Sequence, residues 1–319
     1  MKKLSQLLLL ALSISAFGAD IPRSEFALAD AALQAGEADH ALSLLGSMPS
    51  SAEAHNLRCR VYFTLEHWDE AANECQLAVQ MDAQNATAHL WLGRALGEKA
   101  ENSSFLSAFS LAKRARAEFE QAVNLDPRNG EALSDLGEFY SSAPAVVGGG
   151  NDKAQALVPQ LDKIDPARAH ILLGRIADSR KDYGTAEREY KQAAASSQHP
   201  AFAWMTLASF YCKRQRWDDM EAAVESGYKA AQRDRLAGVA LFNGASVLMR
   251  GKRNYAFAAK MLEEYLADYP KTEEAPAFVA HTRLARLKAL MGDKEAALQQ
   301  RNDALQLAHD YKPALGLSI

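Results

Sequence analysis

The sequence predicts an all-α protein built from a repeated pair of helices. Nearly every segment of the 319 residues has apolar positions at three- and four-residue spacing, which is the pattern of an amphipathic helix. Small residues recur in the middle of alternate helices, and two of the steps between them are 34 residues long. Prolines stand near the expected ends of second helices. A period of this length marks one packing unit, so we expect a solenoid of about eight helix pairs.

The first residues have the layout of a secretory signal peptide. Lys2 and Lys3 precede an apolar stretch over 7–12, and small residues follow near Gly18. We expect cleavage near Gly18, which would leave residues 19–319 as a single solenoid domain. The apolar stretch is far shorter than the roughly 20 residues that a membrane-spanning helix needs. The expected location is therefore periplasmic or secreted, with no transmembrane segment after cleavage.

The charge balance bears on the class of partner. The whole chain has 36 basic and 40 acidic residues, a net charge of −4. Loss of Lys2 and Lys3 would make the remaining chain more acidic still. Because phosphate binding needs clustered positive charge, nucleic acid is excluded as the main expected partner.

The repeat assigns each helix a place. The first helix of a pair has a small residue at its centre, which lets a neighbouring helix approach closely; these residues are Cys59, Gly93, Gly137, Gly174, Ala208, Ala245 and Ala285. The second helix has a small or flexible residue near its start, at Ala41, Ala71, Ala115, Ala154, Ala186, Met220, Ala258 and Ala297. Proline cannot continue a helix, so second helices are expected to end at Asp126-Pro127, Asp165-Pro166, Pro200 and Tyr269-Pro270.

These helix pairs resemble the tetratricopeptide repeat of exported bacterial proteins. A tyrosine follows the small residue in several units, as in Leu136-Gly137 with Tyr140, Ala208 with Tyr211, and Cys59 with Tyr62. The run Gly-Asp-Lys-Glu-Ala-Ala at 292–297 is similar to the same pattern. The resemblance implies a right-handed α-solenoid with eight units, over 22–51, 52–85, 86–129, 130–166, 167–200, 201–236, 237–273 and 274–312.

Units three and four depart from the regular period. Unit three is longer than its neighbours, with the excess between Leu96 and Ala115, and unit four contains a long loop over 141–152. We expect these two insertions to lie side by side at one edge, and in repeat proteins such insertions often mark the binding face. The loop contains Pro144, Gly148, Gly149 and Gly150. A helix is expected before it, where a phosphate-binding loop needs a strand, so we interpret the glycines as a flexible turn.

The resemblance implies that first helices line a concave face. Five residues then occupy one equivalent position, with Asn56 and Phe63 nearby; they are Arg60, Arg94, Glu138, Arg175 and Arg286. Two interpretations remain open. The arginines could hold an extended segment or an acidic tail, because guanidinium suits a carboxylate. They could instead pair with acids such as Glu131 and Glu138 on adjacent helices. The residues of a chaperone-type carboxylate clamp are not complete.

Histidines recur four residues before the small residue of four units, at His55, His89, His170 and His281. Successive units lie roughly 10 Å apart, too far for these side chains to share one metal ion, so packing is the expected role and no metal site is predicted.

The cysteines are open to two interpretations. Cys59 and Cys75 fall on facing helices of unit two, where they could form a disulfide or pack as two small apolar residues. Cys212 has no expected partner.

No nucleophile motif, metal cluster or dinucleotide loop is recognisable, and acid pairs such as Glu273-Glu274 are expected to face water. The sequence therefore predicts a non-catalytic scaffold of the cell envelope, without a cofactor, that binds a protein or peptide segment in its groove. The alternative is a small-ligand or enzyme-accessory role at the edge formed by units three and four.

Overall fold

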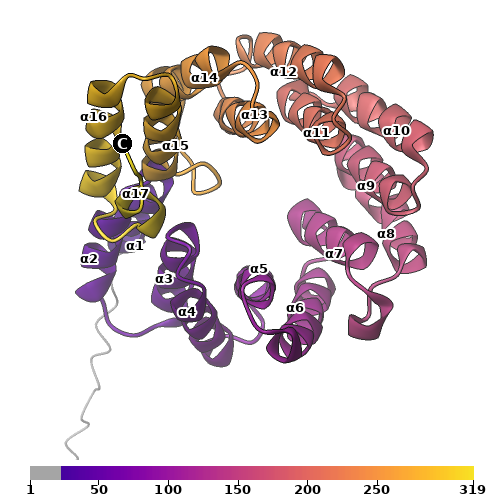
Figure 1. Ribbon diagram of the computed structural model, residues 1–319. Helices are drawn as coiled ribbons and strands as arrows, with labels where there is room; N and C mark the ends of the chain where they lie inside the picture. The colour runs from indigo at the N-terminus through magenta and orange to yellow at the C-terminus, as the bar shows by residue number, and fades with distance from the viewer. Residues whose placement is uncertain (1–22) are drawn as a thin grey trace, which may run out of the picture.

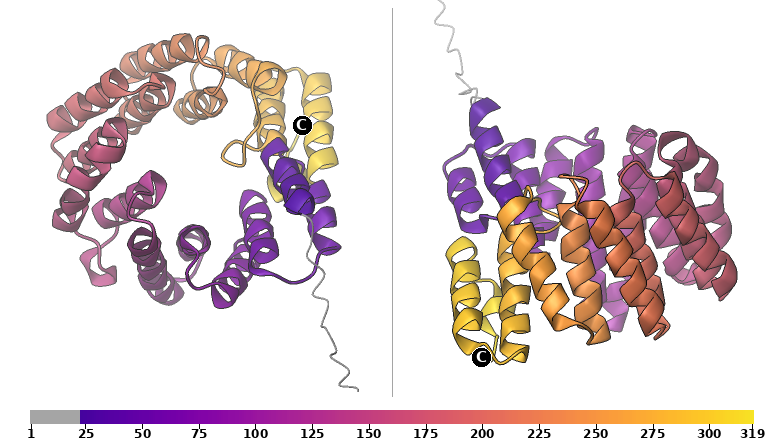
Figure 2. Two further views of the ribbon diagram at one scale, coloured as in Figure 1. Left: turned by 180° about the vertical axis from the view of Figure 1, so that it is seen from behind. Right: turned by 90° about the horizontal axis from the view of Figure 1, so that it is seen from above.

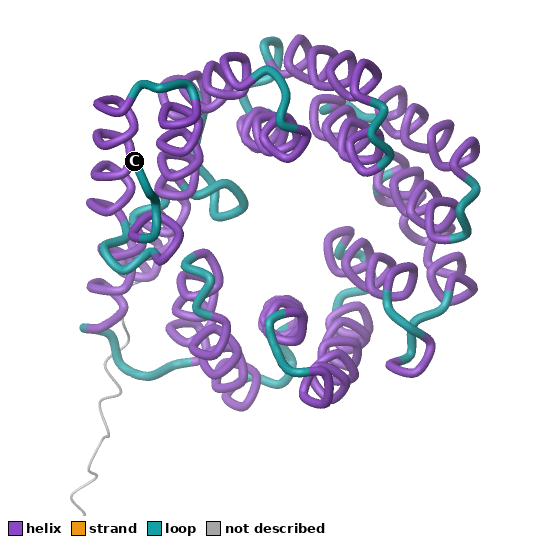
Figure 3. Tube along the Cα trace, in the orientation of Figure 1, coloured by secondary structure: helices purple, strands orange, loops and turns teal. Residues whose placement is uncertain are grey.

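The computed structural model describes residues 23–319 of the chain, which form an all-α solenoid (Figures 1 and 3). The first helices of the eight pairs are α1 (Arg23–Ala35), α3 (Ala52–Thr64), α5 (Ala86–Glu101), α7 (Gly130–Ser142), α9 (Pro166–Ser179), α11 (Pro200–Lys213), α13 (Gly238–Gly251) and α15 (Ala277–Leu290). The second helices are α2 (Ala38–Gly46), α4 (Trp68–Met81), α6 (Phe105–Leu125), α8 (Asn151–Ile164), α10 (Tyr183–Ser196), α12 (Trp217–Ala231), α14 (Tyr255–Asp268) and α16 (Lys294–Leu307). A short helix, α17 (Lys312–Leu315), follows. The prediction of eight helix pairs is confirmed.

Small residues on first helices set the distance between neighbours. A Cβ added at Gly93 would lie 2.7 Å from the ring of Phe119, and one added at Gly174 would lie 2.6 Å from the ring of Tyr190. Neither distance is sterically possible, so only glycine allows these aromatic rings to pack on the backbone. In the solenoid, first helices lie on the inside and second helices on the outside (Figure 1).

Polar side chains and prolines define where helices begin. The side chain of Asn85 accepts a hydrogen bond from the N–H of Ala88 at 3.1 Å, and Asn129 caps α7 in the same way. Pro166 and Pro200 are the first residues of α9 and α11. The second helices α8 and α10 end at Ile164 and Ser196, before these prolines, as predicted. Each proline also begins the next helix, because the first N–H group of a helix has no partner within the helix.

The turns from first to second helices use left-handed backbone. Gly36 and Gly292 adopt positive φ at this point, and so do five non-glycine residues, Glu66, Lys181, Gln215, Lys252 and Asn254. Each of the five has a Cβ that crowds the backbone in this conformation. These turns therefore have a small backbone strain, which a glycine at the same position would relieve.

The solenoid closes on itself into a ring (Figures 1 and 2). One continuous apolar cluster contains Phe26 and Leu33 of the first unit together with Phe278 and Tyr311 near the other end of the chain. Polar contacts cross the same seam, where the hydroxyl of Tyr311 donates to Glu66 at 2.9 Å. The predicted concave groove is thus the interior of a ring.

The two insertions lie side by side, as expected. α5 and α6 have 16 and 21 residues and are the longest helices within 23–319. The loop of unit four, which includes a 3₁₀ helix over Ala145–Val147, packs against α6, where the side chain of Arg116 covers Gly148.

Among residues 23–319, no helix combines the length and apolar character needed to cross a membrane. The expected signal peptide, residues 1–18, lies outside the described residues.

The strained turns give a stability prediction. Lys181→Gly should raise the free energy of unfolding by about 1 kcal/mol, because Lys181 is exposed and glycine adopts its positive φ of 62° without a Cβ clash. Thermal unfolding followed by circular dichroism would show a higher Tm. Lys191→Gly, inside α10, is the control and should lower Tm by a comparable energy. A lower Tm for Lys181→Gly would contradict the role given to this turn.

Candidate binding cavity

Two neighbouring cavities lie inside the ring. The larger, here the first chamber, has a volume of about 600 Å³. Its walls come from α3, α4, α5, α6, α7, α13 and α15 and from the loop over 269–276, and include Phe63, Trp68, Trp91, Phe139, Phe242, Glu66, Glu98, Glu101 and Glu273. The second chamber, of about 480 Å³, lies between α7, α9, α11 and α13 and includes Ile171, Phe202, Val239 and Asn243. The two share Arg94, Asp135, Glu138 and Glu274, so they form one continuous interior.

Three of the four predicted arginines are held in ion pairs. Arg60 donates from Nε and Nη2 to the two carboxylate oxygens of Glu273, at 2.8 and 2.7 Å. Arg94 donates to Asp135 at 2.6 Å and to Glu131 at 3.2 Å. Arg175 pairs with Glu138. For these three arginines the structure therefore supports the second interpretation, in which they pair with acids of the protein. Their charge is neutralised within the protein.

The paired acids outweigh the effect of burial on the pKa of Arg60 and Arg94, whereas burial still raises the pKa of Asp135. Burial alone lowers the pKa of Arg94, but the hydrogen bonds and charges of Asp135 and Glu131 raise it above its ordinary value. The pKa of Arg60 is raised for the same reason by Glu273 and Asp30. A ligand carboxylate would have to displace these partners before it could bind either arginine.

The other predicted groove residues lie in different surroundings. Phe63 lines the first chamber and packs edge-on against Trp68 and Trp91, with ring centroids 5.3 Å apart in both pairs. Asn56 is buried, and its Nδ2 has no hydrogen-bond partner among the described residues. It is therefore not the exposed groove residue that the sequence predicted. Arg286 is exposed and lines neither chamber.

The loop over 269–276 extends into the ring and supplies two acids to it (Figure 1). Glu273 and Glu274 were expected to face water, and this is wrong for Glu273, whose side chain is only 14% exposed. Its N–H donates to Gln34 Oε1 at 3.1 Å, and its carboxylate binds Arg60. The sequence signal was the pair of prolines, Pro270 and Pro276, which lengthen this turn.

Acidic side chains outnumber basic ones around the first chamber. Within residues 23–319, Arg94 and Arg283 are its only basic residues, and its acids are Glu66, Glu98, Glu101, Asp135, Glu138, Glu273 and Glu274. Burial raises the pKa of Glu98, and the charges of Glu101 and Glu66 raise it further. Burial also raises the pKa of Glu274, with Glu131 adding to the effect. The interior therefore has a surplus of negative charge.

The glycine loop of unit four is a hydrogen-bonded turn. The N–H groups of Gly148, Gly149 and Gly150 donate to the carbonyls of Ala145, Pro144 and Tyr140, at 2.9, 3.2 and 2.7 Å. A phosphate-binding loop needs such N–H groups free for the ligand. Gly149 is buried against the carbonyl oxygen of Ala143, so this turn has no room for a side chain. The loop lacks the donors that the small-ligand alternative requires.

The repeated histidines each bind within their own helix pair. Their Nδ1 atoms contact a side chain of the second helix, in the pairs His55 with Glu74 at 2.6 Å, His89 with Glu118 at 2.6 Å, His170 with Glu189 at 2.9 Å and His281 with Gln300 at 2.8 Å. A different set, Asp39, His309 and Asp310, has its potential ligand atoms within 4.8 Å of one another at the seam of the ring. There the N–H and Nδ1 of His309 already contact Asp39, at 2.9 and 2.8 Å.

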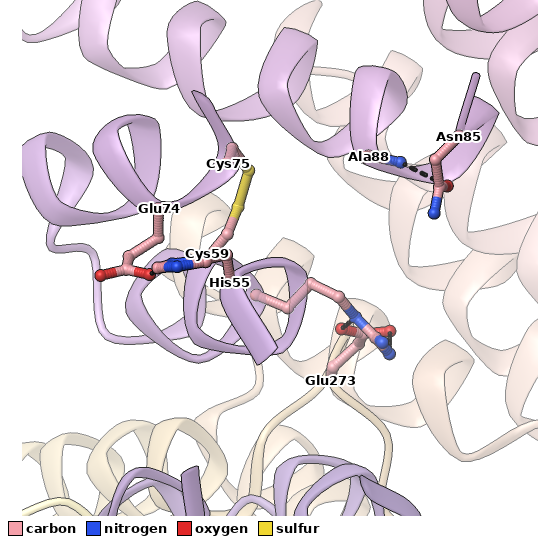
Figure 4. The surroundings of a disulfide bond; sticks show 8 residues. His55, Cys59, Glu74, Cys75, Asn85, Ala88 and Glu273 are labelled. Atoms are coloured by element: carbon pink, nitrogen blue, oxygen red, sulfur yellow. Dashed lines mark hydrogen bonds and ion pairs between the residues drawn. A yellow bond between two sulfur atoms is a disulfide. The ribbon is translucent and has the colours of Figure 1, made fainter. Parts of the chain in front are cut away.

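The structure joins Cys59 of α3 and Cys75 of α4 in a disulfide, with their Cα atoms 5.1 Å apart (Figure 4). The bond lies beside the contact between His55 and Glu74, so two links join this helix pair. Cys212 is a half-buried free thiol.

Comparison with known proteins gives distant similarities. No family profile matches the chain. The mouse and human proteins named superkiller complex protein 3 are each 24% identical to it, over 89% and 85% of this chain but only 18% and 16% of those proteins. The chain thus spans less than a fifth of the length of these curated relatives.

Two solved structures are also similar. A thermophilic tetratricopeptide protein of Thermus thermophilus has a TM-score of 0.49 and 18% identity, covering 59% of this chain and 97% of that one. PilW, described as a widely conserved type IV pilus biogenesis factor, has a TM-score of 0.41 and 19% identity, covering 70% of this chain and 96% of that one. The fold assignment rests on the helix pairs of the chain itself.

The disulfide can be tested by counting thiols. The chain has three cysteines, so the denatured, unreduced protein should react with a thiol reagent once, at Cys212, and three times after reduction. Cys59→Ser with Cys75→Ser should lower the free energy of unfolding by about 3 kcal/mol. A disulfide that closes a loop of this length destabilises the unfolded state by about that much, because it reduces the conformational entropy of the unfolded chain. Three reactive thiols in protein from an oxidising compartment would contradict the bond.

Proposed function

We propose that this protein is a non-catalytic scaffold of the cell envelope that holds an extended segment of another protein inside its ring. Proteins with tetratricopeptide-type repeats generally mediate protein–protein interactions. The observation that carries the proposal is the continuous interior, in which Arg94, Asp135, Glu138 and Glu274 are walls of both chambers. Two chambers in line suit an extended chain better than a compact metabolite.

The second chamber provides both kinds of contact that a peptide needs. Phe202, Leu236 and Val239 form apolar surface, and the first two are exposed, at 49% and 74%. The amide of Asn243 also lines this chamber and makes no hydrogen bond to a described residue. An amide can donate to and accept from one peptide group at once, which would fix the register of a bound segment.

The location in the envelope is part of the proposal. It is supported by the residue pattern near Gly18, which is typical of a signal peptide, and by the cysteine pair in unit two. The curated relatives are named for a complex, which agrees with a role in an assembly.

The small-ligand alternative has less support. Two basic side chains of unit three that could serve such a pocket are already bound, because Lys99 pairs with Asp69 at 2.6 Å and Arg114 donates to Gln76 at 2.7 Å. The N–H groups of Gly148, Gly149 and Gly150 are all bonded to carbonyls.

Site-specific photocrosslinking in cells would test the interior as the binding site. A benzophenone amino acid in place of Phe202, inside the second chamber, should give a discrete protein adduct, and mass spectrometry should map it to one short segment of the partner. The matched control replaces Leu298 on α16, which is 42% exposed but lines no chamber. Equal adducts at both positions, or none at Phe202, would contradict the proposal.

A further inference from the structure

One corner of the first chamber combines acids with aromatic rings. Glu98 and Glu101 lie on the last turns of α5, Glu66 lies in the turn after α3, and Phe63 and Trp68 flank that turn. We call these five residues the acidic corner. Gly97 lies among them, and a Cβ added there would meet no atom within 4 Å. The chamber is therefore open beside Gly97, next to Glu98 in the sequence.

The carboxylates of the acidic corner have no cation as partner. Neither Glu98 nor Glu101 forms an ion pair within residues 23–319, and Glu66 accepts only the hydroxyl of Tyr311, at 2.9 Å. The adjacent Lys99 is bound to Asp69 at 2.6 Å. Burial raises the pKa of Glu98, and the charges of Glu101 and Glu66 raise it further; a bound cation would lower it.

Arg283 is near enough for the charge of Glu66 to act on its pKa, but it is not bound to any of these acids. Arg283 donates to the hydroxyl of Ser246 and lies over the ring of Phe242, 3.9 Å from its centroid. It makes no ion pair with a described carboxylate, and burial lowers its pKa. Arg60, Arg94 and Arg283 thus each have a partner within the protein. In contrast, Glu66, Glu98 and Glu101 form no ion pair with a described residue.

The aromatic rings add a second attraction for a cation. In the neighbouring wall, the guanidinium of Arg94 lies 4.6 Å from the ring centroid of Trp91, and that of Arg60 lies 5.8 Å from it. The same stacking chemistry is available at Phe63 and Trp68, over which no described lysine or arginine lies. Aromatic faces and carboxylates together favour an organic cation.

A bare metal ion fits this corner less well. Metal ligands must converge on one point, and within residues 23–319 the only group of three with that spacing is the set at the seam, Asp39, His309 and Asp310. The carboxylates of the acidic corner do not meet this spacing. The first chamber, of about 600 Å³, has room for a long basic side chain.

We propose that the acidic corner binds a lysine or arginine side chain, so that the segment held in the ring is basic. This inference rests on the proposed function and specifies its partner by charge. The predicted charge of the partner is thus opposite to that of the acidic tail considered in the sequence analysis. That interpretation took the arginines as free, whereas three of them are held in ion pairs.

Binding of hexa-arginine measured by isothermal titration calorimetry tests the proposal. Hexa-citrulline has the same shape without the charge and is the matched control peptide. The intact protein should bind hexa-arginine and show no measurable binding of hexa-citrulline. Glu98→Gln with Glu101→Gln should weaken hexa-arginine binding by about tenfold, the size expected from losing one charge-assisted hydrogen bond.

A charge-matched variant separates the corner from the overall charge. Asp162→Asn with Glu295→Gln removes two exposed acids that line no chamber, and it should change the affinity less than about twofold. Equal weakening by both double variants, or tighter binding of hexa-glutamate than of hexa-arginine, would overturn the inference. Thermal unfolding should show Glu98→Gln with Glu101→Gln to be at least as stable as the parent, because it relieves repulsion.

The crosslinking experiment distinguishes failure of this inference from failure of the proposed function. An adduct at position 202 that maps to a segment without lysine or arginine, unchanged by Glu98→Gln with Glu101→Gln, would overturn the acidic corner and leave the scaffold intact. Absence of any adduct inside the ring would overturn the proposed function itself.

Discussion

The bidentate ion pair between Arg60 and Glu273 is the contact on which the arrangement of the ring depends most. It joins residues 213 apart in sequence, at 2.8 and 2.7 Å, and Gln34 binds the same loop. The loop over 269–276 is thereby held inside the ring against the first units. Because the apolar core is continuous across the same seam, the ion pair selects the position of this loop, and burial of apolar surface supplies most of the closing energy.

Ion pairs determine what the arginines of the first helices can do. Arg60 is paired across the seam with Glu273, so this pair depends on closure. Arg94 and Arg175 are paired with acids of the neighbouring unit. The acids that remain unpaired, with Glu98 and Glu101 foremost, then determine the charge that a ligand meets. A partner is therefore selected by the carboxylates that the protein leaves free.

The features that sequence reasoning predicted are local and periodic. The eight helix pairs follow from small residues such as Gly93 and Gly174, whose contacts lie within one or two units. Ring closure could not be predicted in this way, because it depends on small rotations between units that add up over the whole chain. Glu273 looked like a solvated turn residue since its partner, Arg60, lies 213 residues away along the chain. Asn56 was assigned to the exposed groove, whereas its side chain is buried.

Crosslinking across the seam tests the closed ring most directly. Asp39 and His309 are in contact at 2.8 Å, so Asp39→Cys with His309→Cys, in a chain that also has Cys212→Ser, should oxidise rapidly to an intramolecular disulfide. The control pair, Asp39→Cys with Asp162→Cys, places the second thiol on α8, outside the seam. Peptide mapping under non-reducing conditions would report the bond. The account predicts near-complete linkage of positions 39 and 309 in monomeric protein, and linkage no faster than in the control pair would contradict it.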